Sequence, residues 1–382
     1  MVKPLRDRIA AGHPWVYDRA LAGVPSGVVA GDVVTLVDET GPLATALADP
    51  SSPIRARVLD PDPHAAVDGA WARRRAQAAA ARRARDPLLV GCSGKRLVHG
   101  EGDGLPGLVI DHYDTTAVVV FDGPAATAFW RPRLLDVIAG LEAGLGAELA
   151  HVWLRGDRKE RSAGTSVRGD APAEIVIAED DARFAVDVRA GQKTGFFLDQ
   201  RENRRTVRRH AAGASVLNVF AYTGGFSLHA ALGGATRVTS IDIAAPAIAA
   251  IEHNLRLSRL PVDTHERVAI DAFEYFERAI KRKARWDLVI VDPPSFAPSE
   301  RAKPAALKAY DRLVTAALEL TEPGGRFALA SCSSHVTEAD LLTIAARPQL
   351  RMRLVAGAAS DHPVLPAFPE GAYLKFLLFD VG

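Results

Sequence analysis

Cysteine is rare in this chain of 382 residues, which contains only Cys92 and Cys332. Two cysteines cannot supply a disulfide framework or a cysteine-based zinc site, so the sequence excludes both, and we predict no metal site. Chemistry that depends on sulfur would therefore rest on a single thiol.

Long hydrophobic runs are absent too. An uninterrupted apolar stretch such as Ala117–Phe121 is far shorter than the roughly 18 residues that a membrane span needs. The first residues, Met1–Asp7, lack the apolar stretch of a signal peptide. We therefore expect a cytoplasmic protein with no membrane partner. Its 48% hydrophobic and 24% charged residues are ordinary for a globular protein and exclude collagen, coiled coil and wholesale disorder.

The chain has almost no excess of either charge, and its net charge is +1. This value argues neither for nor against a polyanionic partner. Residues 1–100 hold 14 basic and 10 acidic residues, so the N-terminal part is the basic one. Two arginine clusters are each either a solvated helix face or a surface that contacts phosphates. They comprise Arg73, Arg74, Arg75, Arg82, Arg83 and Arg85, and Arg201, Arg204, Arg205, Arg208 and Arg209.

The length, at about 150 residues per domain, predicts two or three domains. Residues 1–66 are rich in short strands separated by Gly and Pro, which indicates a small barrel-like module. The expected strands are 15–17, 28–30, 33–37 and 54–59. The segment Asp60–His64 contains two prolines and breaks the chain, so we place a boundary near residue 66.

Residues 67–188 mix helical and strand patterns and predict a central α+β domain. The expected helices are 68–86 and 125–141, and the expected strands are 107–110, 117–121, 151–154, 174–178 and 184–188. In residues 189–382 short apolar strands alternate with helical patterns, which predicts an α/β domain with a doubly wound, largely parallel sheet. The expected strands there are 215–220, 238–241, 266–270, 288–291, 327–331 and 373–379.

Informative residues follow four of these strands at their carboxyl ends, where doubly wound sheets bind ligands. Asn218–Phe226 is a turn with two glycines, which lets the backbone approach a ligand. Asp242 stands 18 residues after Gly224, a spacing that suits a carboxylate bound to ribose hydroxyls. Asp271 and Asp292 end the next two strands. Each feature alone is also compatible with a tight connection or a helix N-cap.

Two details narrow the class of ligand. The prolines in Asp292-Pro293-Pro294 stiffen their loop and hold the Asp292 carboxylate at a fixed angle. The NAD-binding pattern G-x-G-x-x-G is absent, since Phe220 and Tyr222 stand where two of its glycines would align. A dehydrogenase is therefore disfavoured.

Three segments resemble one known family. The last 190 residues resemble class I S-adenosylmethionine-dependent methyltransferases, and residues 191–203 (GQKTGFFLDQREN) are similar to the segment before this fold in bacterial large-subunit rRNA methyltransferases. Residues 12–17 (GHPWVY) resemble that group's PUA domain, an RNA-binding barrel, and 102–108 (GDGLPGL) resemble its connecting domain. The resemblance covers nearly the whole chain and is greatest to the branch of 23S rRNA cytosine-C5 methyltransferases.

The resemblance implies S-adenosylmethionine as cofactor, 23S rRNA as partner, and a methyltransferase domain over residues 189–382. It also admits a homodimer, because dimers occur in the family. The implied cofactor-binding residues are Lys193, Gln200, Arg201, Asn218, Phe220, Tyr222, Gly224, Asp242, Asp271 and Phe273. Asn218 departs from the pattern, since many methyltransferases carry an acid there. The target base would lie against Pro293, Pro294 and Phe296, with Asp292 as a catalytic residue.

Cys332 lies in the segment Ala330–His335 (ASCSSH). Carbon 5 of cytosine is a poor nucleophile, so its methylation needs a transient bond to carbon 6, which a thiolate can form. A free cysteine is most often a small buried hydrophobe, but the family's Ser-Cys-Ser motif favours catalysis. His335 either favours the thiolate or starts a helix. Cys92 has no such context and is expected to be structural.

The resulting hypothesis is that the protein forms 5-methylcytosine in 23S rRNA through a covalent adduct with Cys332. The alternative is methylation of a guanine, at its exocyclic amine or at a ring nitrogen, which needs no covalent step. Amine methyltransferases resemble the pattern Asn/Asp-Pro-Pro-aromatic, whereas Ser295 separates Pro294 from Phe296 here. Ser295 also occupies the place of a second cysteine in several RNA cytosine methyltransferases, so the base that removes the carbon 5 proton is not identified.

Overall fold

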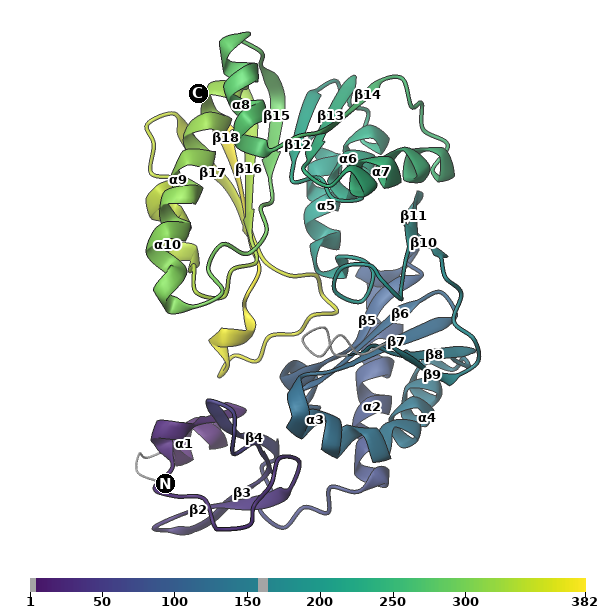
Figure 1. Ribbon diagram of the computed structural model, residues 1–382, viewed down its shortest axis with the longest axis vertical. Coiled ribbons are helices and arrows are strands. Elements are labelled where there is room, and N and C mark those ends of the chain that lie inside the picture. The colour runs from purple at the N-terminus through teal and green to yellow at the C-terminus, as the bar shows by residue number, and fades with distance from the viewer. Residues whose placement is uncertain (1–4, 157–163) are drawn as a thin grey trace. The chain divides into compact units, whose positions relative to one another are not determined.

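The computed structural model describes residues 5–156 and 164–382 (Figure 1). The chain forms two compact units. The first comprises Met1–Ile177, Val186–Leu198 and Ser360–Gly371, and the second comprises Ala178–Ala185, Asp199–Ala359 and Ala372–Gly382. Within the described residues, no helix has both the length and the apolar character needed to cross a membrane. The expected domain boundaries at residues 66 and 188 remain predictions.

The first unit begins with a small β module. Its elements are α1 (Arg6–Ala10), β1 (Trp15–Tyr17), β2 (Val33–Asp38), β3 (Gly41–Ala48) and β4 (Ile54–Asp60). The strands form an antiparallel sheet in the order β1-β4-β3-β2. The expected strand 28–30 is absent, because Gly27 and Gly31 on either side have φ of 94° and 100° and end the extended run. Unpredicted β3 forms because its small side chains, such as Ala44 and Ala46, are fully buried.

The rest of the first unit is an α+β arrangement. Its elements are α2 (Gly69–Ala84), β5 (Gly94–His99), β6 (Leu108–Tyr113), β7 (Thr116–Phe121), α3 (Gly123–Trp130), α4 (Leu134–Leu145), β8 (His151–Leu154) and β9 (Thr165–Arg168). The sheet has the order β5-β6-β7-β8-β9, in which only β7 and β8 are parallel. The helix predicted over 125–141 is two helices, because Pro132 interrupts it. Two further strands, β10 (Ile175–Glu179) and β11 (Ala182–Val186), pair with each other, and Ala178–Ala185 of this hairpin belong to the second unit.

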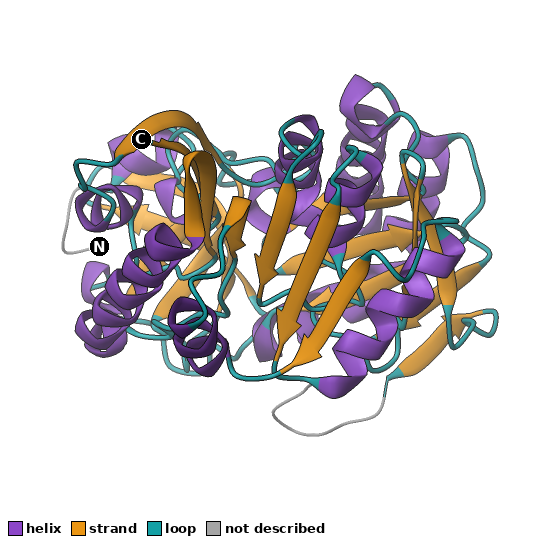
Figure 2. Cartoon of the chain, turned by 90° about the horizontal axis from the view of Figure 1, so that it is seen from above, coloured by secondary structure: helices purple, strands orange, loops and turns teal. Residues whose placement is uncertain are grey.

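The second unit contains a seven-stranded sheet in the order β14-β13-β12-β15-β16-β18-β17. The strands from β14 to β16 are parallel, and β18 runs antiparallel to β16 and β17. The elements are α5 (Arg201–Arg209), β12 (Ser215–Val219), α6 (Gly225–Leu232), β13 (Arg237–Asp242), α7 (Ala245–Leu257), β14 (His265–Ala269), α8 (Ala272–Lys281), β15 (Trp286–Val291), α9 (Lys303–Leu320), β16 (Thr321–Ser331), α10 (Glu338–Ile344), β17 (Leu350–Ala356) and β18 (Lys375–Val381). This is the predicted doubly wound α/β fold, and Figure 2 distinguishes its strands from its helices.

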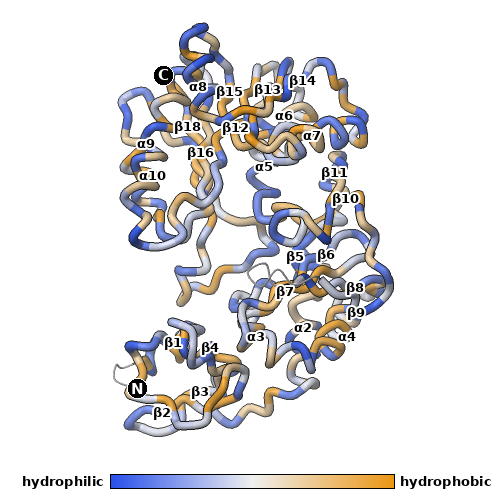
Figure 3. The backbone as a smooth tube through the Cα atoms, in the orientation of Figure 1, coloured by the Kyte–Doolittle hydropathy of each residue, from blue (hydrophilic) through white to orange (hydrophobic). Residues whose placement is uncertain are grey.

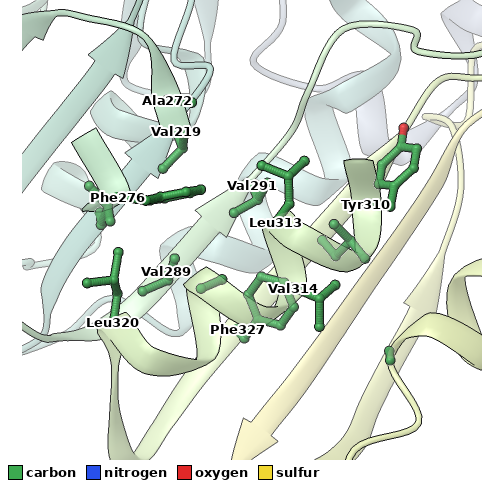
Figure 4. Close-up of a cluster of buried hydrophobic side chains, with 14 of the residues drawn as sticks. Val219, Ala272, Phe276, Val289, Val291, Tyr310, Leu313, Val314, Leu320 and Phe327 are labelled. Atoms are coloured by element: carbon green, nitrogen blue, oxygen red, sulfur yellow. The ribbon is translucent and has the colours of Figure 1, made fainter. Parts of the chain in front are cut away.

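Helices cover both faces of this sheet because side chains alternate along each strand. Leu217 and Val219 of β12 join a hydrophobic cluster with α8, α9 and α10, whereas Val216 joins a second cluster with α5 and α6. Figure 4 shows the first cluster, in which Phe276 of α8 and Leu313 of α9 lie over the sheet. The hydrophobic strands can be followed in Figure 3.

Both arginine clusters are partly structural. Arg83 on α2 is 4% exposed and its guanidinium contacts both carboxylate oxygens of Asp103 at 2.6 and 2.7 Å. On α5, Arg204 is 2% exposed and binds the carboxylate of Glu179. These buried arginines are held by carboxylates of their own unit, so neither alternative, solvated face or phosphate contact, describes them.

Candidate functional site

A strained turn follows β12 at the carboxyl edge of the sheet. Phe220, Tyr222 and Gly224 have φ of 63°, 47° and 86°, which is the left-handed region. Two of the three carry side chains, for which this conformation is costly and usually tied to function. A Cβ on Gly224 would lie 3.1 Å from side-chain atoms of Ile251 and Leu228, so glycine lets the turn pack closely on the helices behind it. The turn therefore presents backbone groups at the edge where such sheets bind ligands.

The half-buried Asp242 at the end of β13 supports this turn. Its Oδ2 accepts a hydrogen bond from the backbone N–H of Tyr222 at 2.8 Å, and its Oδ1 accepts one from Ala244 at 2.9 Å. Each carboxylate oxygen has two lone pairs, so both keep an acceptor site. A carboxylate fixed at this place with spare acceptor sites fits the ribose of a nucleoside cofactor.

Asp271 is the N-cap of α8. Its Oδ1 accepts hydrogen bonds from the backbone N–H groups of Phe273 and Glu274 at 2.9 and 3.1 Å. The guanidinium of Arg312 lies over the Phe273 ring, 4.2 Å from its centroid. The cap orients this loop, and the predicted contact of Asp271 and Phe273 with the cofactor stays a prediction.

A chain of amides orients Asp292, which follows β15. Gln200 Nε2 donates to Asp292 Oδ2 at 3.0 Å. Gln200 is itself held through its Oε1, which accepts a hydrogen bond from Asn203 Nδ2 at 2.6 Å. Beside it, Asp199 is 2% exposed, and its Oδ2 accepts a hydrogen bond from Tyr373 Oη at 2.6 Å. The segment before α5 is thus joined to the loop that carries the predicted catalytic carboxylate.

Three further predicted cofactor residues make contacts within the protein. Asn218 is fully buried, and its Nδ2 donates to Ser227 Oγ on α6 at 2.8 Å. Arg201 is also fully buried, and its Nε lies 3.3 Å from Glu202 Oε1. Lys193 belongs to the first unit, where its ammonium lies 4.5 Å from the centroid of the Phe197 ring. Their roles toward a cofactor stay predictions.

The loop that carries Cys332 is held against the Asp292 loop by serine hydroxyls. Ser333 Oγ accepts a hydrogen bond from the backbone N–H of Phe296 at 3.2 Å and lies 3.3 Å from Ser295 Oγ. Ser331 Oγ accepts one from Tyr310 Oη of α9 at 2.8 Å. Both serines therefore fix the backbone on either side of the half-exposed Cys332.

Aromatic rings connect the Asp292 loop to the turn after β12. The Phe296 ring lies 6.5 Å from that of Phe220 and 5.5 Å from that of Tyr310, in edge-to-face arrangements. Burial raises the pKa of Tyr310 to about 12, with a smaller contribution from the charges of Cys332 and Asp292. Tyr310 lies within α9, and Figure 4 shows its side chain beside those of Leu313 and Val314 of the same helix.

The remaining predicted groups lie as follows. Pro293 is buried and Pro294 exposed. His335 Nδ1 lies 3.1 Å from Glu300 Oε2. His335 stands two residues before Thr337, the N-cap of α10. Cys92 is buried in the first unit.

Sequence patterns do not single out Tyr310 and Lys375, although Tyr310 contacts Ser331 and Lys375 contacts Ser333 on either side of Cys332. Lys375 offers one detectable signal, since it is a charged residue in the otherwise apolar run Leu374–Phe379. Such a lysine must find partners inside the fold. Tyr310 lies within an ordinary amphipathic helix and offers none.

Two family profiles match the chain. The profile described as S-adenosylmethionine-dependent methyltransferase matches residues 95–380, well over half of the sequence. The chain belongs to this methyltransferase family. Its cofactor is therefore S-adenosylmethionine, as predicted. The second profile, described as a PUA-like domain, matches residues 3–61 of the methyltransferase and agrees with the predicted N-terminal module.

Curated relatives match the methyltransferase over nearly its whole length. It is 39% identical to the "Ribosomal RNA large subunit methyltransferase" of Deinococcus radiodurans over 394 aligned residues. The alignment covers 97% of this chain and 95% of that protein. It is 34% identical over 375 residues to the "Ribosomal RNA large subunit methyltransferase I" of Cronobacter sakazakii, with 95% and 94% covered.

Solved structures share the fold of the methyltransferase. A structure from Streptococcus mutans, described as a SAM-dependent methyltransferase, is 23% identical with a TM-score of 0.86 and covers 100% of this chain and 99% of that one. A methyltransferase complexed with SAH is 23% identical with a TM-score of 0.85, covering 98% and 97%. The predicted fold class is confirmed.

Proposed function

We propose that the methyltransferase forms 5-methylcytosine in 23S rRNA through a transient covalent bond to Cys332. The observation that carries this proposal is the junction of two loops, in which Ser333, next to Cys332, accepts a hydrogen bond from Phe296 in the Asp292 loop. A nucleophile and a carboxylate therefore share one edge of the sheet with the cofactor turn. The relatives named as large-subunit rRNA methyltransferases, which match nearly end to end, support rRNA as the substrate.

The thiolate of Cys332 supplies what carbon 5 of cytosine lacks. Its electron pair forms the bond from Sγ to carbon 6, which makes carbon 5 nucleophilic. Bound S-adenosylmethionine supplies an electrophilic methyl group for carbon 5. A general base, which the proposal does not assign to a side chain, then takes the proton from carbon 5. The electron pair of that C–H bond forms the double bond between carbons 5 and 6, the bond from Sγ to carbon 6 breaks, and its electron pair returns to sulfur. Amine methylation needs none of these steps.

Asp292 acts on the base rather than on the cofactor. Negative charge develops on a ring nitrogen of cytosine during attack, so the Asp292 carboxyl group, in its protonated form, donates a hydrogen bond to the base edge and lowers the barrier. Gln200 holds Asp292 Oδ2 and so orients the group. Pro293 and Pro294 stiffen the same loop, and the Phe296 ring adds an apolar surface for the base.

Mass spectrometry of rRNA from cells with and without this protein tests the assignment of the product. We expect one 5-methylcytosine of 23S rRNA to disappear with the protein. Loss of a methyl group from guanine would instead support the alternative reaction. Complete 23S methylation in the absence of the protein would contradict both.

Cofactor binding should depend on Asp242. We expect Asp242→Ala to weaken S-adenosylmethionine binding by about 1 to 3 kcal/mol, or about 5- to 150-fold in Kd, because ribose hydroxyls lose their acceptor. Titration calorimetry measures this, with Asp263→Ala, an exposed carboxylate in the loop before β14, as the matched control. Equal affinity in wild type and Asp242→Ala would remove Asp242 from the cofactor site.

The N-terminal module should contribute affinity for rRNA. Arg8, Arg19 and Arg55 lie in the PUA-like match, and none of them forms an ion pair with a described residue. Replacing all three with glutamine should reduce the slope of log affinity against log salt by about one unit for each phosphate that the variant no longer binds. Filter binding at several salt concentrations measures the slope.

The control for this experiment is a triple glutamine variant at three basic residues of the second unit, Arg259, Lys281 and Lys283, which are exposed. Substitution is preferable to deleting the module, because Leu47 and Leu59 pack in one core with Trp71 and Trp130. An equal decrease of the slope in the two triple variants would remove the N-terminal arginines from the account of RNA binding.

A further inference from the structure

Lys375 is a buried lysine beside the Cys332 loop. It begins β18, stands opposite Ser331 of β16 in the antiparallel pair, and is 6% exposed. Its Nζ donates to the carbonyl oxygens of Ser333 and Tyr373 at 2.7 and 2.8 Å. Among the described residues no carboxylate forms an ion pair with it, which is unusual for a buried ammonium group.

The charged and titratable groups that face Lys375 come from three elements. Cys332 lies in the loop after β16, and its negative form attracts the ammonium. Asp340 on α10 attracts it more weakly, and that carboxylate is itself paired with Lys303 at 2.8 Å. Tyr310 on α9 donates a hydrogen bond to Ser331, the last residue of β16 and the one before Cys332. Burial nevertheless lowers the pKa of Lys375 to about 8.

We propose that Lys375 is the positioning residue of Cys332, which fixes the Cys332 loop through two carbonyls and favours the thiolate by placing a positive charge beside it. This inference rests on the proposed function. One hydrogen bond ends on the carbonyl of Ser333, the residue after Cys332, so the ammonium is held next to the backbone of the nucleophile. An ammonium has three N–H donors, and the two carbonyls use two of them, which leaves the third for the sulfur.

The proton balance of the pair is simple. Cys332 and Lys375 share one proton, which lies on Sγ in the unreactive form and on Nζ in the reactive form. The S–H bond breaks, an N–H bond forms, and the freed electron pair of sulfur makes the bond to carbon 6. When the bond from Sγ to carbon 6 breaks, the electron pair returns to sulfur beside the ammonium, ready for the next turnover.

The test measures the reactivity of Cys332 in the full-length protein without RNA or cofactor. The rate of iodoacetamide alkylation at Cys332 is followed by peptide mass spectrometry from pH 6 to 10, which separates it from Cys92. In wild type we expect the midpoint of the rate profile below the roughly 8.5 of an ordinary thiol. Lys375→Gln keeps amide donors but removes the charge, so the midpoint should rise by about one pH unit and the rate at pH 7 fall about tenfold.

Two further variants separate charge from packing. Lys375→Arg keeps the positive charge and should restore most of the lost rate. Lys308→Gln, an exposed lysine of α9, removes the same charge away from Cys332 and should leave the profile unchanged. Calorimetric binding of S-adenosylmethionine shows that each variant is folded.

Several outcomes would overturn the inference. A wild-type midpoint at or above about 8.5 would do so even if Lys375→Gln failed to fold. The inference would also be overturned if Lys375→Gln lowered the alkylation rate by the same factor at all pH values. That result would indicate only a change in the access of iodoacetamide to Cys332. These results are separate from the proposed function, which fails if Cys332→Ala retains methyl transfer whatever the alkylation profile shows.

Discussion

Replacing Cys332 with alanine is expected to reduce methyl transfer to 23S rRNA by roughly 10³-fold or more, because no other side chain can then bond to carbon 6. Cofactor binding should be unchanged, since the turn at Phe220–Gly224 follows β12 and Asp242 ends β13, whereas Cys332 follows β16. Rates are measured with a radioactive methyl donor under single-turnover conditions, and binding by calorimetry.

The same prediction is tested by trapping the covalent adduct between the enzyme and RNA with 5-fluorocytosine. Fluorine cannot leave carbon 5 as a proton does, so the adduct with the wild-type enzyme should persist and be seen as a protein–RNA band. Cys92→Ala is the matched control and should trap normally, because Cys92 is buried in the other unit. A Cys332→Ala enzyme that retains near wild-type turnover would reject the cytosine mechanism and favour guanine methylation.

The second large effect concerns stability, at the buried ion pair of Arg204 and Glu179. Arg204 Nε donates to Glu179 Oε1 at 2.6 Å, and His229 Nε2 lies 2.9 Å from the same oxygen. All three side chains are almost fully buried. Arg204→Met should therefore destabilise the protein by about 3 to 5 kcal/mol, because it leaves a carboxylate without its cation inside the fold. Urea unfolding followed by tryptophan fluorescence measures the change.

The double variant Arg204→Met with Glu179→Met is the control. Removing both charges should recover much of the stability, since two apolar side chains need no partner. A double variant as unstable as Arg204→Met alone would show that packing rather than charge is responsible.

The ion pair of Arg204 and Glu179 should also make the stability of the protein fall at low pH. Burial alone would raise the pKa of Glu179, but the charge and hydrogen bonds of Arg204, with His229, hold it well below its usual range. Its contribution is present in full above the ordinary pKa of glutamate, about 4.3, and is lost as the pH falls below that value. The double variant should lack this acid-dependent destabilisation.

Much of the fold follows from patterns that are local in the chain. Apolar runs alternate with helical patterns from residue 189 onward, and they form the sheet and helices of the second unit. The differences between the expected and the observed elements also have local causes. Pro132 divides one expected helix, and the pattern does not predict β17, because Arg351 and Arg353 interrupt its apolar residues at the edge of the sheet. Edge strands expose one side to water and so carry a weaker signal.

The sequence by itself also determined which residues end the central strands. The turn at Asn218–Gly224, Asp242 and Asp292 meet at one edge because parallel strands joined by helices place all their carboxyl ends together. That rule needs only the order of elements along the chain. It does not say which side chains at that edge touch.

Only the tertiary structure decided those contacts. It turned Asn218 inward to Ser227, joined Gln200 to Asp292 across 92 residues of sequence, and set Lys375 against Ser333 across 42. The last contact exists because β18 enters the sheet antiparallel beside β16, the strand that leads to Cys332. Periodicity reports whether a side chain is buried, whereas the partner of a buried charge depends on which strands become neighbours, and that is a property of the whole sheet.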